Sequence, residues 1–238
     1  MRDASSPALT ERLAAARRRV AEAARAAGRD PADVRVLLAT KTLPDDVVRA
    51  AVEAGGTLLG ENRVAELVAH VAAVADLGPE VHFIGRLQSN KVNALLRVDR
   101  PAVGCVESVD STGLAERLSR RCDALGRELE VMCQVNVSGE PTKAGVAPAE
   151  AADVAREVAA LPRLRLVGFM TVGLNSADRA AVREGYARLR AVRDDVVRGL
   201  PDARELSMGM SGDLELAVAE GATIVRLGTA VFGPRPRP

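Results

Sequence analysis

One lysine in this chain lies where it could form a covalent bond with a carbonyl compound. Only three of the 33 basic residues are lysines, and one of them, Lys41, directly follows the apolar run from Val34 to Thr40. A lysine amine that loses its proton attacks a carbonyl carbon and forms an imine, whereas an arginine guanidinium stays protonated and cannot. The residue type and its place at the end of a predicted strand therefore indicate Schiff-base chemistry. The alternative is an ordinary surface lysine near a loop.

Two short segments near the end of the sequence have the residue types of a phosphate site. Ser211 comes at the start of a predicted helix, where unpaired backbone N–H groups and the helix dipole favour an anion. Gly228 lets backbone amides approach a phosphate closely, and Thr229 adds a hydroxyl. Ser211 could instead only cap its helix, and Gly228 could only form a turn. We favour phosphate binding, because both segments follow the last two predicted strands, where barrels often bind phosphate.

Arg226 is a charged residue inside the apolar run Ile224–Leu227. Its side chain must therefore point into the interior of the fold or extend along the surface to reach water. An arginine in the mouth of a barrel could face the pyridine nitrogen of pyridoxal 5'-phosphate (PLP), a cofactor that also needs a Schiff-base lysine and a phosphate site. Lys41, Arg226 and the two phosphate-binding segments would supply all three.

The elements that would position these residues alternate between strands and helices. The sequence predicts an N-terminal helix from Pro7 to Ala27, and then eight short apolar strands separated by helical patterns. The predicted strands are Val34–Ala39, Thr57–Leu59, Val81–Ile84, Val103–Val106, Leu129–Val135, Leu164–Phe169, Arg204–Leu206 and Thr223–Leu227. The predicted helices among them cover residues 45–54, 61–76, 88–97, 111–126, 148–161, 177–199 and 211–220.

This alternation predicts an α/β fold, a single (β/α)8 TIM barrel with an extra N-terminal helix. The 238 residues contain no long linker, so we expect one domain over residues 1–238. An open doubly wound sheet is the alternative, but no Gly-x-Gly-x-x-Gly fingerprint follows a predicted strand. In a barrel the loops after the strands build the site, so the residues at the strand ends are the candidates.

Composition argues against several classes of protein. The net charge is +1 and the sequence has four aromatic residues, whereas a nucleic-acid surface needs a basic face or stacking rings. No apolar stretch approaches the roughly 20 residues of a membrane span, and the N-terminal segment lacks the apolar core of a signal peptide. The two histidines and three cysteines lack the spacing of metal ligands. We expect the cysteines to be reduced thiols, with Cys105 and Cys133 packed in strands, and this fits a cytoplasmic protein. The arginine run 17–19 is interpreted as a solvated helix face.

Five motifs follow one another at the predicted strand ends. They are Ala39-Thr-Lys-Thr42, Gly60-Glu-Asn62, His82-Phe-Ile-Gly85 with Leu87-Gln-Ser-Asn-Lys91, Ser207-Met-Gly-Met-Ser211 with Asp213, and Arg226-Leu-Gly-Thr229. Together they resemble the pyridoxal phosphate homeostasis proteins, which are single-domain relatives of the alanine racemase barrel. The resemblance runs from about residue 9 to residue 233 and implies a PLP-binding barrel of fold type III.

The resemblance implies a role for each candidate residue. Lys41 would hold PLP as an internal aldimine, and Arg226 would keep the pyridine nitrogen unprotonated, which weakens the cofactor as an electron sink. The other cofactor-binding candidates are Ser211, Gly228 and Thr229 for the phosphate, and Asn62, Met170, Ser207 and Met208 for the pocket lining. Leu43 stands where many relatives have a second lysine, which puts PLP transfer through that neighbour in doubt. Lys143 matches a loop lysine of relatives; we favour an exposed loop lysine over a secondary PLP contact.

Three functions fit these residues to different degrees. We favour a non-catalytic PLP carrier or regulator, a cytoplasmic monomer that buffers the cofactor or delivers it to apo-PLP enzymes, without nucleic-acid, membrane or metal partners. An amino-acid racemase is the alternative, but racemases of this type use a second domain and a tyrosine base from a partner subunit. The one tyrosine here, Tyr186, falls in a predicted helix away from the strand ends. A Schiff-base aldolase would use Lys41 but would leave Arg226 without a role.

Overall fold

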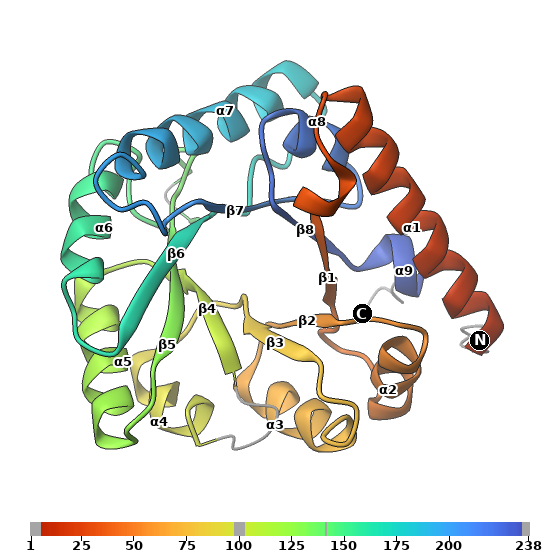
Figure 1. The fold of residues 1–238 in the computed structure, drawn as a ribbon, viewed down its shortest axis with the longest axis horizontal. Helices are drawn as coiled ribbons and strands as arrows, with labels where there is room; N and C mark the ends of the chain where they lie inside the picture. The colour runs from red at the N-terminus through yellow and green to blue at the C-terminus, as the bar shows by residue number, and fades with distance from the viewer. Residues whose placement is uncertain (1–5, 98–102, 141, 235–238) are drawn as a thin grey trace.

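The chain forms a closed barrel of eight parallel strands surrounded by helices (Figure 1). The computed structural model describes residues 6–97, 103–140 and 142–234. Each strand pairs in parallel with the next along the chain, and the last strand pairs with the first. The predicted α/β barrel is therefore confirmed, and the open doubly wound sheet is wrong. The first five residues, which belong to the segment judged to lack a signal-peptide core, lie outside the described residues.

The eight strands lie close to their predicted positions. They are β1 (Arg35–Ala39), β2 (Leu58–Glu61), β3 (Glu80–Phe83), β4 (Val103–Val109), β5 (Leu129–Gln134), β6 (Leu164–Met170), β7 (Glu205–Met210) and β8 (Ile224–Leu227). The largest difference is β7, which was predicted to end at Leu206. It continues because Met210 pairs with Arg226 of β8. Gly209 within it has φ of 89°, a conformation suited to glycine, which is why this part of the strand resembles a loop in sequence.

Helices cover the outside of the barrel. They are α1 (Ser6–Ala26), α2 (Asp45–Glu53), α3 (Val64–Ala73), α4 (Val92–Leu95), α5 (Thr112–Ala124), α6 (Ala151–Ala159), α7 (Arg179–Val196), α8 (Leu214–Ala219) and α9 (Thr229–Phe232), with 3-10 turns η1 (Pro31–Asp33) and η2 (Ser89–Lys91). The helix predicted at 88–97 is divided into η2 and α4, α8 begins three residues later than predicted, and α9 was not predicted. Among the described helices, none combines the length and hydropathy needed to cross a membrane.

Side chains along each strand point alternately into the barrel and outward to the helices. One buried apolar cluster fits the interior positions: Leu37, Leu58, Cys105, Met132, Val167, Met170 and Ile224. A larger cluster fills the space between strands and helices, and it includes Leu38, Leu59, Phe169, Met208 and Val225. The same alternation places Ser207 and Arg226 inside the barrel.

The N-terminal helix α1 lies against the side of the barrel, next to α8 and α9 (Figure 1). Arg19 donates to the carbonyl oxygen of Ser211 at 2.8 Å and binds both carboxylate oxygens of Glu215. Arg17 donates to a backbone carbonyl oxygen just after α2, at 2.6 Å. Arg17 and Arg18 are exposed and Arg19 is partly exposed, in line with the interpretation of the run 17–19 as a solvated face, and two of the three arginines also hold α1 against the barrel.

Candidate functional site

Six of the nine candidate cofactor-binding residues line one cavity at the carboxyl ends of the strands. The cavity has a volume of about 300 Å³, at the lower end of the range for ligand pockets. Its lining consists of Ala39, Lys41, Asn62, Ile84, Val172, Met210, Ser211, Gly212, Arg226, Gly228 and Thr229. The barrel thus brings together residues from the two ends of the sequence, with Lys41 and Arg226 as the two ionisable side chains of this lining.

Lys41 follows β1 in a turn whose backbone is strained. Thr42 has φ of 61°, a region that a β-branched residue rarely adopts. The Thr42 N–H donates to the Glu66 carboxylate at 3.1 Å, and the Leu43 N–H donates to the carbonyl oxygen of Thr40 at 3.1 Å. Such strain persists only where the surroundings determine the conformation, and it occurs often at functional sites. The turn therefore holds the backbone of Lys41 in one position at the cavity.

A buried histidine–glutamate pair lies behind this turn. His70 Nδ1 is 2.7 Å from Glu61 Oε1, and His70 Nε2 is 3.0 Å from the carbonyl oxygen of Leu43. The Thr40 hydroxyl donates to the same Glu61 oxygen. Because a carboxylate and a carbonyl both accept, both ring nitrogens must carry a proton. Burial lowers the pKa of His70, but the hydrogen bond to Glu61 and its charge outweigh burial, so the pKa is raised. The pair fixes both sides of the Lys41 turn.

Arg226 reaches the cavity from the inner face of β8. Its Nη1 donates to the carbonyl oxygen of Ser207 at 2.7 Å and to the Ser207 hydroxyl at 2.9 Å, and its Nη2 donates to the carbonyl oxygen of Thr171 at 2.6 Å. A guanidinium has five N–H donors. The Nε–H and one Nη2 hydrogen have no acceptor within the described residues, so Arg226 can donate into the cavity to a ring nitrogen.

The loops after β7 and β8 offer backbone N–H groups to an anion. The N–H groups of Ser211, Gly212, Gly228 and Thr229 donate to no backbone acceptor in the part of the chain that the structure describes. The Ser211 hydroxyl accepts from the Ala230 N–H at 3.2 Å and ties the two loops together. The prediction that Ser211 lies at the start of a helix is wrong, and so is the alternative that it only caps one, because α8 begins at Leu214 with Asp213 as its N-cap residue. Loop amides, rather than the end of α8, form the candidate phosphate site.

Three candidate lining residues are buried outside the cavity. Met170 belongs to the interior apolar cluster. Ser207 is fully buried, and its hydroxyl lies between Arg226 and Glu107. Met208 packs between the strands and the helices, because it directly follows the inward-facing Ser207. The structure does not bring these three side chains to the lining, and Ser207 meets the site only through Arg226.

Lys143 and Tyr186 also lie outside the lining. Lys143 Nζ donates to the Glu140 carboxylate at 2.7 Å and to the carbonyl oxygen of Gly173 at 2.8 Å, so this loop lysine is held in place. Tyr186 is buried, and its hydroxyl donates to the Asp213 carboxylate at 2.8 Å. The tyrosine therefore reaches the loop after β7, contrary to the expectation that it lies away from the strand ends. Burial and the charge of Asp213 raise the pKa of Tyr186.

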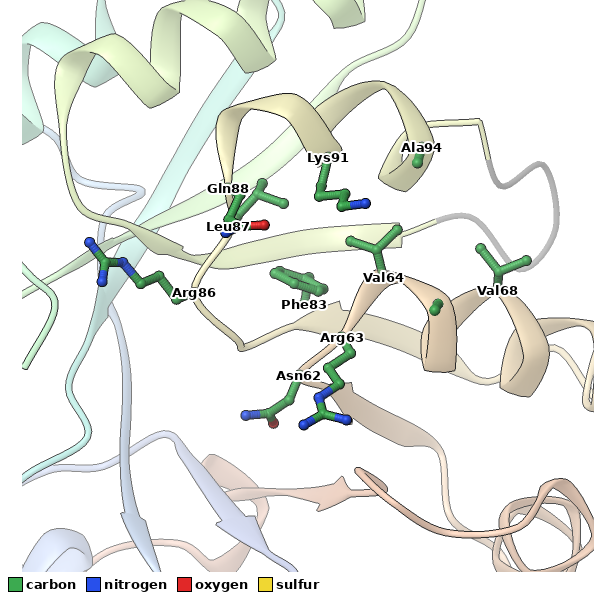
Figure 2. Close-up of a pocket in the computed structure, with 11 residues that line it drawn as sticks. Asn62, Arg63, Val64, Val68, Phe83, Arg86, Leu87, Gln88, Lys91 and Ala94 are labelled. Carbon is green, nitrogen blue, oxygen red and sulfur yellow. The ribbon is translucent and has the colours of Figure 1, made fainter.

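A second cavity, of about 580 Å³, adjoins the first at Asn62. It lies between α3 and the segment that joins β3 to α4, and Figure 2 shows Phe83 at its centre with Val64 beside the ring and Lys91 above it. This cavity is larger, but its lysine lies on the 3-10 turn η2, without an arginine from the barrel interior and without the loop amides. The cavity around Lys41 is therefore the candidate cofactor site.

Glu107 is a residue of this region that the sequence reasoning missed. It is fully buried in β4, where one carboxylate oxygen lies 2.6 Å from His82 Nδ1 and the other accepts from the Ser207 hydroxyl at 2.5 Å. A signal was present, because Glu107 interrupts the apolar run Val103–Val109 as Arg226 interrupts its own strand. His82 is joined to Arg226 through Glu107 and Ser207.

The lining fits a phosphorylated aromatic aldehyde such as PLP. Lys41 supplies an amine for the aldehyde carbon, and Arg226 supplies a donor for a ring nitrogen. The loop N–H groups that have no described acceptor match a phosphate. These three groups differ in chemistry and face one cavity, so the site favours a ligand that carries all three complementary groups.

Comparisons with known proteins show the family of this chain. The family model described as the alanine racemase N-terminal domain matches residues 12–236. The pyridoxal phosphate homeostasis protein of Pseudomonas aeruginosa is 45% identical over 95% of this chain and 96% of its own. A solved structure of an unknown protein from Bifidobacterium adolescentis has a TM-score of 0.90 and 40% identity, covering 98% of this chain and 97% of that one.

A further solved structure contains the cofactor. PipY of Synechococcus elongatus with PLP bound has a TM-score of 0.81 and 34% identity, and the match covers 94% of this chain and all of PipY (100%). Matches at this identity over nearly the whole length of both chains show a common family. The chain belongs to the pyridoxal phosphate homeostasis proteins.

Proposed function

We propose that this protein binds PLP at Lys41 and acts in PLP homeostasis inside the cell, as a carrier or regulator without a catalysed reaction of its own. The observation that carries the proposal is that Lys41, Arg226 and the loop amides line one cavity. The name of its relatives and the PLP in the PipY structure support the same cofactor and role.

Each group of the cofactor has a counterpart in the cavity. Lys41 would hold the cofactor covalently, through its amine and the aldehyde carbon. Arg226 donates a hydrogen bond to the ring nitrogen, which must be unprotonated in order to accept it. When bound, PLP supplies an electron sink, and an unprotonated ring makes that sink weaker. The loop amides hold the phosphate.

The lining favours a carrier over a racemase. Among the described lining residues the ionisable side chains are Lys41 and Arg226. A guanidinium keeps its proton at neutral pH, so Arg226 does not serve as a base. Racemisation needs proton transfer on both faces of the substrate carbon, and Tyr186 is held by Asp213 outside the lining. These observations support a protein that holds PLP.

The scarcity of lysine permits a sharp test of the binding residue. PLP added to the apo-protein should produce the visible absorption of a lysine imine, and borohydride reduction followed by mass spectrometry should place the label on the peptide that contains Lys41. Lys41→Ala and Lys41→Arg should both lose the absorption, since arginine keeps the charge but forms no imine. Lys143→Arg is the matched control and should keep it. An unchanged spectrum in Lys41→Ala contradicts the assignment.

Amino-acid racemisation separates the two functions. PLP-loaded protein should show no Lys41-dependent racemisation of alanine at ordinary enzyme rates. Rates of about 1 per second or faster, lost in Lys41→Ala, would establish the racemase instead. A cell that lacks the gene should show altered pools of PLP and its phosphorylated precursor, whereas loss of a single amino-acid product would indicate an enzyme.

We further infer that the working unit is a monomer with a single barrel domain, and that it acts in the cytoplasm. We also infer that apo-PLP enzymes accept the cofactor from it. The three cysteines are buried and free, which fits a reducing compartment. Light scattering should give the mass of one chain. The rate of PLP transfer to an apo-aminotransferase should rise with the acceptor concentration, whereas a rate independent of the acceptor would indicate release into solution only.

A further inference from the structure

A row of charged and polar side chains crosses the barrel interior and ends at Arg226. In order it consists of Glu80, His82, Glu107, Ser207 and Arg226. His82 Nε2 is 2.7 Å from Glu80 Oε1, and His82 Nδ1 is 2.6 Å from Glu107 Oε1. The Ser207 hydroxyl donates to Glu107 Oε2 at 2.5 Å and accepts from Arg226 Nη1 at 2.9 Å.

The charges along this row alternate at neutral pH. Both ring nitrogens of His82 face carboxylates, so the ring carries two protons and a positive charge. Burial opposes that charge, but the hydrogen bonds to Glu107 and Glu80 raise the pKa of His82 to about 9. Burial raises the pKa of Glu107, but its hydrogen bond to His82 and the nearby Arg226 charge outweigh burial and lower it. Glu107 is therefore a carboxylate between two cations.

Stability alone does not account for such a row. Barrel interiors are usually filled with layers of branched apolar side chains. Replacing a buried ionic group by apolar residues of similar volume is often neutral or stabilising, so ion pairs are not needed to fill this space. Of the five residues in this row, Arg226 is the one that lines the cavity. Its effect on function must therefore reach the cavity through that residue.

We propose that Glu107 is a positioning residue for the cofactor, acting through Ser207 on Arg226. Its carboxylate accepts the hydrogen bond of the Ser207 hydroxyl, so the hydroxyl oxygen is left to accept from Arg226 Nη1. The guanidinium is thereby held with its remaining donors toward the cavity. Its negative charge also offsets part of the positive potential that Arg226 creates near Lys41. The proposal rests on the proposed binding of PLP at Lys41, and it adds a residue that does not line the site.

Glu107→Gln removes the charge and keeps the shape of the side chain. The variant should still form the imine, because Lys41 is intact, but PLP should bind about tenfold more weakly, since Arg226 is no longer held by a charged network. The bound spectrum should shift toward the neutral imine, because the uncompensated guanidinium disfavours a second positive charge nearby. Dissociation constants from absorbance titration and the spectrum at fixed pH measure both effects.

Two further variants separate a positioning role from a structural one. Glu220→Gln changes another buried carboxylate, which pairs with Arg183 and Arg190 away from the cavity, and it should lower stability without changing the spectrum. Ser207→Ala removes the link but leaves the Glu107 charge, so it should weaken PLP binding with a smaller spectral shift. It also tests the proposal if Glu107→Gln does not fold.

The outcomes distinguish this proposal from the proposed function. Wild-type affinity and spectrum in Glu107→Gln, or in Ser207→Ala if the first variant does not fold, would overturn the positioning role alone. The same spectral shift in Glu220→Gln would overturn it too, because a general loss of stability would then be sufficient. A wild-type protein without a PLP imine at Lys41 would overturn both proposals.

Discussion

His70 Nδ1 lies 2.7 Å from Glu61 Oε1, and both side chains are buried on the outer side of the barrel wall, behind the turn that carries Lys41. Arg226, in contrast, is held from the inner side, by Ser207 and the carbonyl oxygen of Thr171. The two functional side chains of the cavity are thus fixed from opposite sides of the wall, and changes on each side should affect PLP binding separately.

Glu61→Gln should weaken the turn at Lys41. The amide retains one acceptor for Thr40 but no longer balances the charge on His70, so the free energy of unfolding should fall by about 2 kcal/mol. PLP should bind several-fold more weakly, because Lys41 is held less firmly. Urea unfolding of the apo-protein and a PLP titration measure the two effects.

Glu66→Gln is the control at the same turn. Glu66 accepts from the Thr42 N–H at 3.1 Å near the surface, and the glutamine oxygen can replace it, so the loss should be below about 0.5 kcal/mol. If Glu61→Gln matches the wild type in both measurements, the buried pair does not position Lys41.

Arg19→Lys should disturb the candidate phosphate loop from outside. Lysine keeps the charge of Arg19 but cannot bind both Glu215 oxygens and the carbonyl oxygen of Ser211 together. We expect a loss of about 1 kcal/mol in unfolding free energy, together with weaker binding of PLP. Arg18→Lys, an exposed neighbour in the same helix, should change neither. Equal PLP affinity in both variants would mean that α1 does not support the loop.

The barrel could be predicted because its determinants are local. Short apolar runs such as Val103–Val106 and Leu164–Phe169 are bounded by turn residues, and their alternation with helical patterns permits few folds. Lys41 and Arg226 were identified for the same reason, since the meaning of a lysine after a strand or an arginine within one depends only on its immediate neighbours. Both line the cavity in the structure.

What could not be predicted depends on pairing between distant strands. Met208 was assigned to the pocket by the resemblance. Pairing of Met210 with Arg226 extends β7, and Met208 packs between the strands and the helices instead. The partners of Glu107 are 25 residues away at His82 and 100 residues away at Ser207. No local pattern in the sequence predicts that these three side chains meet. The one local signal was the charge of Glu107 inside an apolar strand, and it does not identify the partners.

Gly85→Ala should damage the site through backbone overlap. A Cβ at Gly85 would overlap the backbone of Asn62, with the carbonyl carbon of Asn62 only 2.6 Å away, and Asn62 lines the cavity. The backbone must move, so we expect a loss of about 1–3 kcal/mol in stability and a marked loss of PLP affinity. Gly113→Ala, in α5 with no atom within 4 Å of the added Cβ, should instead be neutral or stabilising by up to about 1 kcal/mol.

The wild-type protein should become less stable as the pH rises above neutrality. The pKa of His82 is raised to about 9 in the fold by its hydrogen bonds to Glu107 and Glu80, despite burial, whereas the unfolded chain has the ordinary value near 6.5. The folded state therefore binds more protons, and the stabilisation is complete below about pH 6.5 and is lost as the pH rises through about 9. Between pH 6.5 and 8 the unfolding free energy should fall by roughly 1–2 kcal/mol from this group.

His82→Gln tests the origin of that slope. The variant should be less stable near pH 6.5 and should lose a large part of the decrease between pH 6.5 and 8, because its side chain does not titrate. The comparison stops at pH 8 because burial also raises the pKa of the Cys105 and Cys133 thiols. At higher pH these thiols would lose their protons in the unfolded chain only, and this would lower the free energy of unfolding in both proteins. His70, whose pKa is also raised, stays in both proteins and leaves a common residual slope. If the unfolding free energies of the wild type and of His82→Gln fall in parallel as the pH rises, the His82 ring is neutral. The assignment of alternating charges from Glu80 to Arg226 would then be contradicted.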